Sequence, residues 1–104
     1  MNIVVSFHDR PASESLAWTA RRAVAHALDR FASRIRSITV KIRDENGQKG
    51  GLDQHCSLAV AVADGREFHL HDTDASPESA VHRLAGRAAR LVRETFAKAR
   101  RRRR

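Results

Sequence analysis

Several features are scarce in this chain, and each scarcity excludes a class of protein. The 104 residues include one cysteine, Cys56, so no disulfide can form within the chain. That fits a reducing compartment, and we expect a cytoplasmic protein. No apolar run approaches the length that spans a bilayer, and residues 1–5 lack the pattern of a signal peptide. We therefore expect neither a membrane partner nor a secreted, disulfide-stapled fold.

Sequence motifs of catalysis are also missing. There is no nucleophile elbow, no paired metal-ligand motif and no glycine-rich dinucleotide fingerprint. Cys56 falls in an alternating strand pattern, where a cysteine is most simply a small buried apolar residue. We expect no enzyme activity, no cofactor and no small-molecule substrate. Tyrosine is absent and aromatic residues make up 5%, so bases are not expected to stack on an aromatic sheet.

Positive charge, in contrast, is abundant. Lysine and arginine number 20 against 12 aspartate and glutamate, which gives a net charge of +8 and a pI near 11.4. Charge of this sign and size points to a polyanionic partner, and RNA is the partner that we expect. Residues 100–104 are all arginine. They form a basic tail that is either a solvated end or an arm that contacts phosphates.

Hydrophobic periodicity predicts one domain over residues 1–99. Alternating apolar and polar residues predict strands near residues 3–7, 38–42, 56–62 and 66–70. Apolar residues at helical spacing predict helices over residues 13 to about 33 and 77 to about 99, capped by Ser13 and Ser76. A flexible polar loop is expected at residues 44–51. The order β-α-β-β-β-α predicts an α+β fold, with two helices packed on one face of a four-stranded mixed sheet.

Side-chain alternation also predicts the register of the last hairpin. A three-residue loop of Ala63, Asp64 and Gly65 buries the large residues of both strands together, because it pairs Val60 with Phe68. Gly65 then supplies the left-handed position that such a loop needs. The face toward the helices is expected to hold Val5, Val40, Val60 and Phe68. The face open to water is expected to hold Thr39, Lys41, His69 and His71.

Basic residues line one side of the second predicted helix. Arg83, Arg87 and Arg90 recur about one turn apart, opposite the apolar stripe. A row of guanidinium groups suits phosphates, whereas an ordinary solvated helix face mixes both signs of charge. We therefore predict an RNA contact there. The other candidates, on the two helices and in the glycine-rich loop, are Arg93, Lys98, Arg21, Arg22, Arg30, Arg34 and Lys49.

Three histidines are expected together on the open sheet face, because His69 and His71 share a strand face and His55 lies diagonal to His71. Such a trio could bind zinc or nickel as a small metal sensor. A functional site usually adds a carboxylate or cysteine ligand, and Cys56 is expected on the other face. Surface histidines often occur without a ligand, so we expect no metal.

The chain resembles a known family over nearly its whole length, and the resemblance is clearest in two segments from residue 38 onward. The first comprises residues 38–44, 46–47, 49–51, 53 and 56, and the second comprises Asp72, Asp74, residues 80–81, Arg83, Arg87 and Arg90. These residues are similar to short members of the bacterial ribosome hibernation-promoting factor and ribosome-associated inhibitor family, also called sigma-54 modulation proteins. The resemblance implies a translation inhibitor that acts in ribosome hibernation under stress.

The same resemblance implies a partner and a site. The partner would be 16S ribosomal RNA of the small subunit, in the channel used by messenger and transfer RNA. Arg83, Arg87 and Arg90, with Lys49, would contact that RNA. Away from the ribosome we expect a monomer, and without the C-terminal extension of long members we do not expect it to pair ribosomes unaided. The alternative is a general double-stranded RNA-binding module, which would read a minor groove.

The chain also departs from this family at four helix positions. Val24 and Ala27 stand where members often have lysines. Glu78 and His82 stand where members often have an aromatic residue and an acid. The departures near the start of the second helix leave two interpretations open, an altered affinity for the same RNA or a divergent paralogue with another RNA target.

Overall fold

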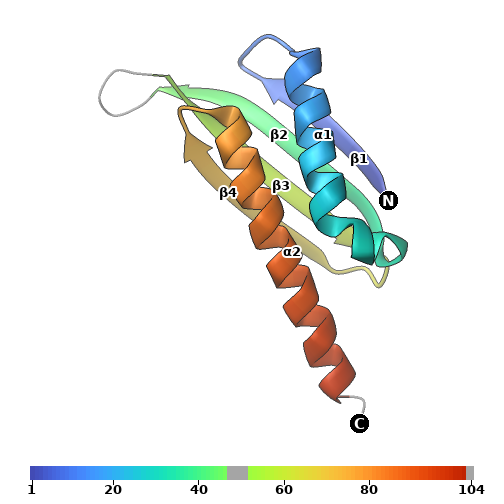
Figure 1. The fold of residues 1–104 in the computed structure, drawn as a ribbon. Helices are drawn as coiled ribbons and strands as arrows, with labels where there is room; N and C mark the ends of the chain where they lie inside the picture. Colours follow the sequence, from blue (N-terminus) through green and yellow to red (C-terminus); the bar gives the residue numbers. More distant parts are fainter. Residues whose placement is uncertain (47–51, 103–104) are drawn as a thin grey trace.

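The computed structural model describes residues 1–46 and 52–102, and its strands and helices follow the predicted order. The elements are β1 (Asn2–His8), α1 (Glu14–Leu28), the 3-10 helix η1 (Asp29–Arg34), β2 (Ile35–Asn46), β3 (Leu52–Val62), β4 (Glu67–Asp74) and α2 (Pro77–Arg102). Figure 1 shows α1 and α2 lying side by side across the sheet, with their first residues at the same end of the molecule.

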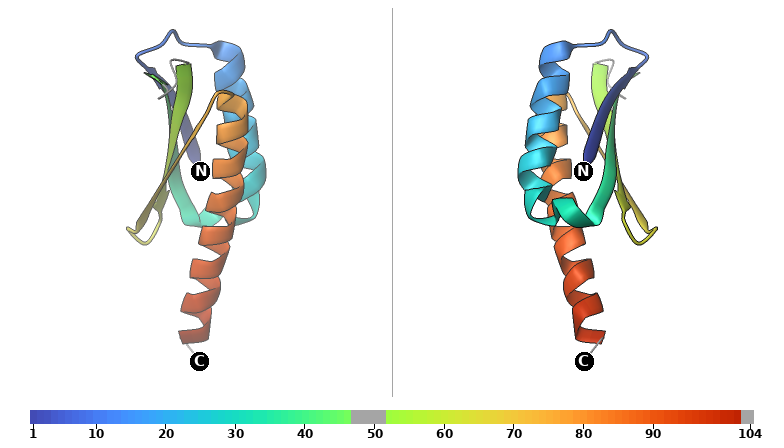
Figure 2. Two further views of the ribbon diagram at one scale, coloured as in Figure 1. Left: turned by 90° about the vertical axis from the view of Figure 1, so that its left-hand side faces the viewer. Right: turned by 90° about the vertical axis from the view of Figure 1, so that its right-hand side faces the viewer.

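The four strands form a single mixed sheet in the order β1-β2-β3-β4. β1 runs parallel to β2, and the other two neighbouring pairs are antiparallel. A parallel pair needs a crossover connection, which α1 provides. Figure 2 shows both helices on one side of the sheet and none on the other. The predicted fold class is confirmed.

The core fills the space between the sheet and the two helices. Val40 and Val60 are fully buried at its centre, and Val5 and Phe68 pack against it from the edge strands. Because successive strand residues point to opposite faces, the alternate positions face water. These positions include Lys41, His69 and His71, which are exposed, and Thr39, which is partly exposed. Both predicted faces of the sheet are confirmed.

The β3–β4 hairpin has the predicted loop and register. Val60 pairs with Phe68 and Leu58 with Leu70. The Val62 amide donates to the Arg66 carbonyl at 2.8 Å, which encloses the three loop residues between them. Gly65 adopts a φ of 98°, a conformation that a side chain would strain, and its amide donates to the Val62 carbonyl at 3.0 Å.

The first helix ends earlier than predicted. α1 stops at Leu28, and η1 tightens the chain where the periodicity predicts one helix to about residue 33. The tighter turn brings Phe31 against Phe96 of α2, with ring centroids 5.7 Å apart, before β2 begins. A contact between distant parts of the chain therefore decides this boundary.

The central hairpin is longer than predicted. β2 continues to Asn46, although a loop is predicted from residue 44. The polar residues remain in the sheet because they bond across it, as when the Gln54 side-chain amide donates to an Asp44 carboxylate oxygen at 2.5 Å. Arg10, at the β1–α1 connection, donates to the carbonyl oxygen of the same Gln54 side chain. The glycine-rich part of the predicted loop, residues 47–51, lies outside the described residues.

The second helix also continues beyond its predicted end near residue 99. α2 extends to Arg102, so the first residues of the arginine tail are helical. Arginine is a good helix former, and the buried ring of Phe96 holds the preceding turn against the core. Figure 1 shows the last turns of α2 running past the end of the sheet.

Candidate nucleic-acid interface

The first turns of α2 are tied to β4 by ion pairs. The Arg83 guanidinium donates from Nε to Asp72 and from Nη2 to Asp74, each at 2.8 Å. Arg87 donates to the His71 carbonyl at 3.1 Å, and its Nη1 lies 4.0 Å from Asp72. We call this group of four side chains (Asp72, Asp74, Arg83 and Arg87) the clamp. It joins the exposed side of α2 to the edge strand.

The two carboxylates of the clamp are held in their charged form. The hydrogen bond from Arg83 lowers the pKa of Asp72 below its ordinary value. The Ser76 backbone amide, and then Arg83, lower the pKa of Asp74. The same hydrogen bonds raise the pKa of Arg83. The positive charge of Arg83 is therefore balanced within the protein, although its side chain is 47% exposed.

This geometry distinguishes two parts of the predicted arginine row. Arg83, Arg87 and Arg90 do share one side of α2, and all three are exposed. Only Arg83 and Arg87, however, form ion pairs with the acids at the end of β4. Arg90 lies three residues further along α2 than Arg87. The row thus divides into a paired part and a part that faces solvent.

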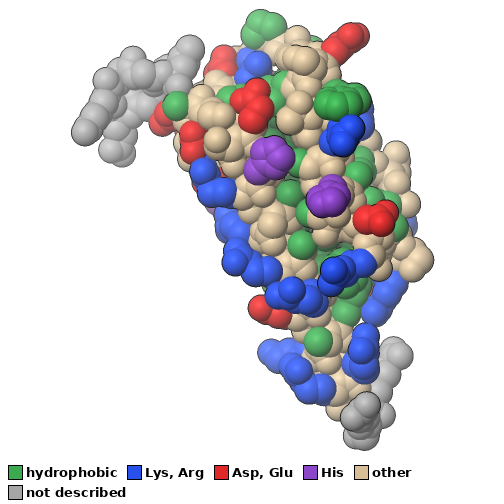
Figure 3. Space-filling view, viewed as in Figure 1, with side chains coloured by type: hydrophobic (Ala, Val, Ile, Leu, Met, Phe, Trp, Pro, Cys, Tyr) green, Lys and Arg blue, Asp and Glu red, His purple; other side chains and the backbone are tan. Residues whose placement is uncertain are grey.

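The second part of α2 carries exposed lysine and arginine side chains that form no ion pair among the described residues, with Glu94 as the one acid between them in the sequence. Within residues 1–46 and 52–102, no carboxylate forms an ion pair with these side chains. We call the group the basic end, and its exposed members are Arg90, Arg93, Lys98, Arg100 and Arg101. In Figure 3, Lys and Arg side chains run down the α2 edge of the helix face and gather at its lower end. Most Asp and Glu side chains on that face lie near the opposite end.

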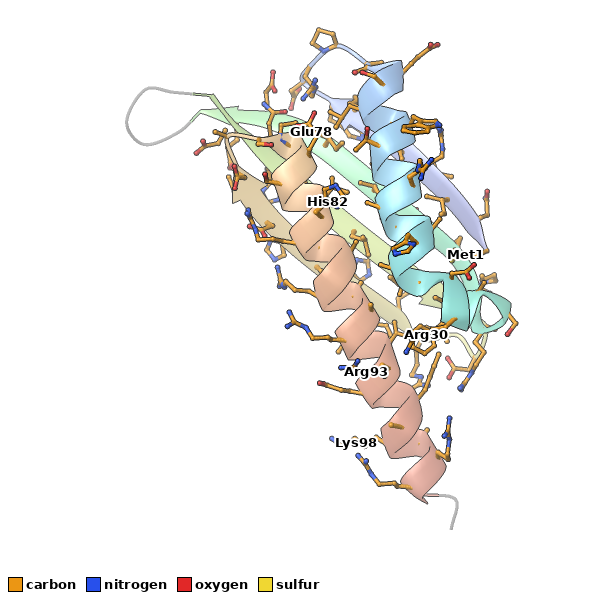
Figure 4. The ribbon with its side chains drawn as sticks, in the orientation of Figure 1. Met1, Arg30, Glu78, His82, Arg93 and Lys98 are labelled. Atoms are coloured by element: carbon orange, nitrogen blue, oxygen red, sulfur yellow. The ribbon has the colours of Figure 1, made fainter. Side chains whose placement is uncertain are left out.

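The 3-10 helix η1 adds further cations beside the basic end. Figure 4 shows Arg30 near Arg93, and Lys98 about a turn and a half further along α2. The Arg34 guanidinium lies over the Phe96 ring, 3.5 Å from its centroid. Such stacking orients Arg34 and leaves its charge available, because a ring face does not neutralise a cation as a carboxylate does. The predicted Arg30 and Arg34 therefore lie beside Arg93 and Phe96.

The remaining sequence candidates lie elsewhere. Arg21 and Arg22 are exposed on α1, and the Arg22 guanidinium lies 4.8 Å from the centroid of the Trp18 ring. Trp18 is 58% exposed and was not predicted as a site residue. The available signal is its position, which falls between the core positions Leu16 and Ala20 and off the apolar stripe. Lys49 lies outside the described residues.

The histidines of the open sheet face lie close together, but the described residues do not group them into a set of three metal ligands. The rings of His55 and His71 are 5.7 Å apart, and His55 Nδ1 lies 3.2 Å from the Thr73 hydroxyl. In the described part of the chain, no three His, Cys, Asp or Glu side chains converge as metal ligands. The sensor interpretation therefore has no geometric support among these residues.

Cys56 has the buried place that its strand pattern predicts. Its side chain is fully buried, and burial, followed by the charge of Asp72, raises the pKa of the thiol to about 11. A thiol with such a pKa stays protonated near neutral pH and is a poor nucleophile.

Among the described residues, none of the helices has the length and apolar character that crossing a bilayer requires.

Comparison with known proteins shows the same fold in two solved structures. A ribosomal subunit interface protein from Coxiella burnetii superposes with a TM-score of 0.77 at 14% identity, over 93% of this chain and 99% of the other. The N-terminal domain of Protein Y from Thermus thermophilus superposes with a TM-score of 0.69 at 17% identity, over 91% and 99%. No protein-family model and no curated protein sequence matched the chain.

Proposed function

We propose that this protein is a ribosome-associated translation inhibitor that binds the small ribosomal subunit. Its target would be 16S ribosomal RNA in the channel for messenger and transfer RNA. The observation that carries the proposal is the basic end of α2, whose exposed arginines have no acidic partner in the described part of the chain. The fold adds support, because one protein that shares it is named for the ribosomal subunit interface.

Inhibition of this kind needs occupancy and no covalent chemistry. Arginine presents a planar fork of N–H donors that matches the oxygens of a phosphate. Each phosphate that is neutralised releases condensed counterions, so binding gains free energy at low salt and loses it as salt rises. A protein held in the channel by such contacts would exclude messenger and transfer RNA. The basic end, with Arg30 and Arg34 beside it, would form the contact surface.

The clamp has a different part in this proposal. Arg83 and Arg87 would hold α2 at a fixed angle to β4 and so position the basic end. The Arg87 side chain is 42% exposed, and its ion pair with Asp72 is long, at 4.0 Å. Arg87 could therefore still reach a phosphate. Lys49, Arg21 and Arg22 remain predicted RNA contacts.

Sedimentation in sucrose gradients tests the proposal. The intact chain is mixed with purified 30S subunits, 50S subunits or an RNA duplex, at low and at physiological salt. We expect comigration with 30S subunits at both salt concentrations, weaker at the higher one, and little comigration with 50S subunits. Equal binding to all three would favour the general RNA-binding module, and no binding to 30S subunits would refute the proposed function.

Loss of translation is the second readout. Added protein should inhibit synthesis in a purified translation system, and excess messenger RNA added beforehand should reduce that inhibition. Inhibition that excess messenger RNA does not affect would place the protein outside the channel.

A further inference from the structure

A groove runs between the exposed faces of α1 and α2. Its volume is about 520 Å³, and it is shallow and open to solvent. The floor consists of small side chains, Ala23 and Ala27 of α1 and Ala85 of α2, together with Gly86. A Cβ atom on Gly86 would meet no side chain and no other element within 4 Å. The groove is therefore open above α2 and has room for a flat ring.

Trp18 forms one wall of this groove. Its 58% exposure exceeds that of the other exposed large hydrophobic residues, Met1 at 40% and Val4 at 47%. Leaving so large an apolar surface in water is unfavourable, and exposed tryptophans are typical of binding surfaces. Arg22 lies one turn further along α1, with its guanidinium 4.8 Å from the ring centroid. This contact orients the indole ring before any partner arrives, which lowers the entropy cost of binding.

Two histidines supply polar edges above the apolar floor. His26 of α1 and His82 of α2 both line the groove and are both exposed. Figure 4 shows His82 on the side of α2 that faces α1. The ring nitrogens of histidine donate and accept hydrogen bonds. An apolar floor, an aromatic wall and polar edges together match a flat ring with polar groups on its rim.

The charges around the groove indicate that its occupant is anionic. Figure 4 places Arg30 and Arg93 toward its lower end and Glu78 near the upper end. With Arg22 in the wall, and with Asp29 beside His26 and Arg30, the surroundings of the groove hold three cations against two acids. An apolar protein segment would gain little from such a surround, whereas a nucleotide has both an aromatic base and a phosphate.

We propose that the groove between α1 and α2 binds one unstacked base of a single-stranded RNA segment, with Trp18 as the stacking surface. Arg22 contacts the phosphate beside that base, and His26 and His82 contact the edges of the base. The inference rests on the proposed RNA-binding function and deepens it, because it adds recognition of a base to recognition of the backbone.

Trp18 is itself the probe for this site. It is the one tryptophan of the chain, and the chain has no tyrosine, so intrinsic fluorescence above the phenylalanine range reports this residue alone. The chain is titrated with single-stranded oligoadenylate and with an abasic oligonucleotide of equal length and charge, at the same salt concentration. We expect both to bind, and we expect only the strand that carries bases to quench the fluorescence.

Three variants locate the effect. Trp18→Leu should weaken binding of oligoadenylate about 5- to 30-fold, as expected for loss of one base stack, and should leave abasic binding unchanged. Gly86→Leu should fill the groove and abolish the quenching of Trp18. Ser79→Leu is the matched control, because it adds the same side chain at an exposed position of α2 that does not line the groove. Circular dichroism of each variant checks that the protein remains folded.

The outcomes separate this inference from the proposed function. Equal quenching by the two strands, or equal oligoadenylate binding by the native chain and Trp18→Leu, would overturn the base site and leave backbone binding intact. If Trp18→Leu weakened 30S binding while free RNA caused no quenching, the occupant would be a protein and the base site would be wrong. If the native chain bound neither strand nor 30S subunits, the proposed function itself would fail.

Discussion

The two parts of α2 use the same residue type for different purposes. In the clamp, Arg83 and Arg87 point toward the acids of β4, and Arg83 forms two hydrogen bonds of 2.8 Å with them. In the basic end, Arg90 and Arg93 lie past those acids, and no carboxylate among residues 1–46 and 52–102 pairs with them. The residue itself is the same in both parts, and only its surroundings differ.

This difference shows how a charge becomes available for binding. An arginine that already bonds to two carboxylates has to leave them before it can bind a phosphate in full, and that exchange cancels most of its gain. An arginine without an acidic partner loses only its hydration and its mobile counterions. We therefore assign stability to the clamp and RNA affinity to the basic end.

Reversing charge at the basic end should produce the largest effect. The variant Arg90→Glu, Arg93→Glu, Lys98→Glu replaces attraction to phosphate with repulsion, and we expect 30S affinity to fall by at least about 100-fold. The salt dependence should become shallower by about 2–3 in log K against log salt, since roughly 0.7–0.9 is lost for each phosphate contact. Gradient sedimentation at several salt concentrations measures both. An unchanged circular dichroism spectrum provides the control, and undiminished 30S binding by the folded variant would contradict the assignment.

Removal of residues 100–104 should have a smaller effect on binding. Arg100 and Arg101 extend the exposed helical surface, but they lie beyond the end of the sheet, where we expect them to add only non-specific phosphate contacts. We expect 30S affinity to fall by the order of 10-fold at low salt, with the specificity for 30S over 50S subunits retained. Unchanged affinity would mean that the tail takes no part. Loss of that specificity would place the anchor in the tail.

The stabilising contribution of the clamp should be lost in acid, because its carboxylates must be charged to bond with Arg83 and Arg87. The pKa values of Asp72 and Asp74 are lowered by folding, so their stabilising contribution is complete above the ordinary value of about 3.9. It is lost as the pH falls through the lowered folded-state values. Asp72→Asn should therefore lower the melting temperature at pH 7. The decrease should be only a few degrees, because an ion pair in contact with solvent contributes little to stability.

Thermal unfolding of native protein and Asp72→Asn between pH 7 and pH 2 checks this prediction. The two melting curves should converge as the pH falls below about 4. A difference that stayed constant across this range would show that the carboxylate charge of Asp72 does not stabilise the fold.

Gly86→Ala should produce the smallest effect, and it should raise the stability of the protein where Asp72→Asn lowers it. Gly86 lies between Arg83 and Arg87 on the exposed side of α2, where an added Cβ meets no neighbour. The substitution should stabilise the protein by about 0.5–1 kcal/mol, because alanine loses less backbone entropy in a helix. Urea unfolding measures the gain. An unchanged or lower stability would show that the backbone entropy of Gly86 does not limit the stability of α2.

Much of the fold could be predicted from the sequence, because its signals are local and repeated. The alternation of Val60, Phe68 and their neighbours specified the strand faces, and the size of the loop before Arg66 specified the hairpin register. Ser13 and Ser76 marked the helix starts, and each hydroxyl accepts an amide hydrogen bond at 3.2 Å. The predicted ends of α1 and β2 were wrong, because contacts between distant parts of the chain decide where these elements end.

The candidate site was predicted less completely. The arginine row on α2 was visible in the sequence, but its division into the clamp and the basic end was not. Which arginines Asp72 and Asp74 contact depends on how α2 crosses β4. The exposure of Trp18 had a weak signal in its position off the apolar stripe. The groove beside it depends on the spacing between α1 and α2, which no local pattern encodes.

The comparison between the clamp and the basic end is tested most directly by two matched double variants of the same helix. Arg83→Gln, Arg87→Gln and Arg90→Gln, Arg93→Gln each remove two positive charges through the same substitution. Each is assayed for sedimentation with 30S subunits and for its melting temperature. We expect the second variant to lose 30S binding at an unchanged melting temperature, and the first to melt lower while retaining most of its binding. The opposite result, with binding lost from the first variant and retained by the second, would contradict the account.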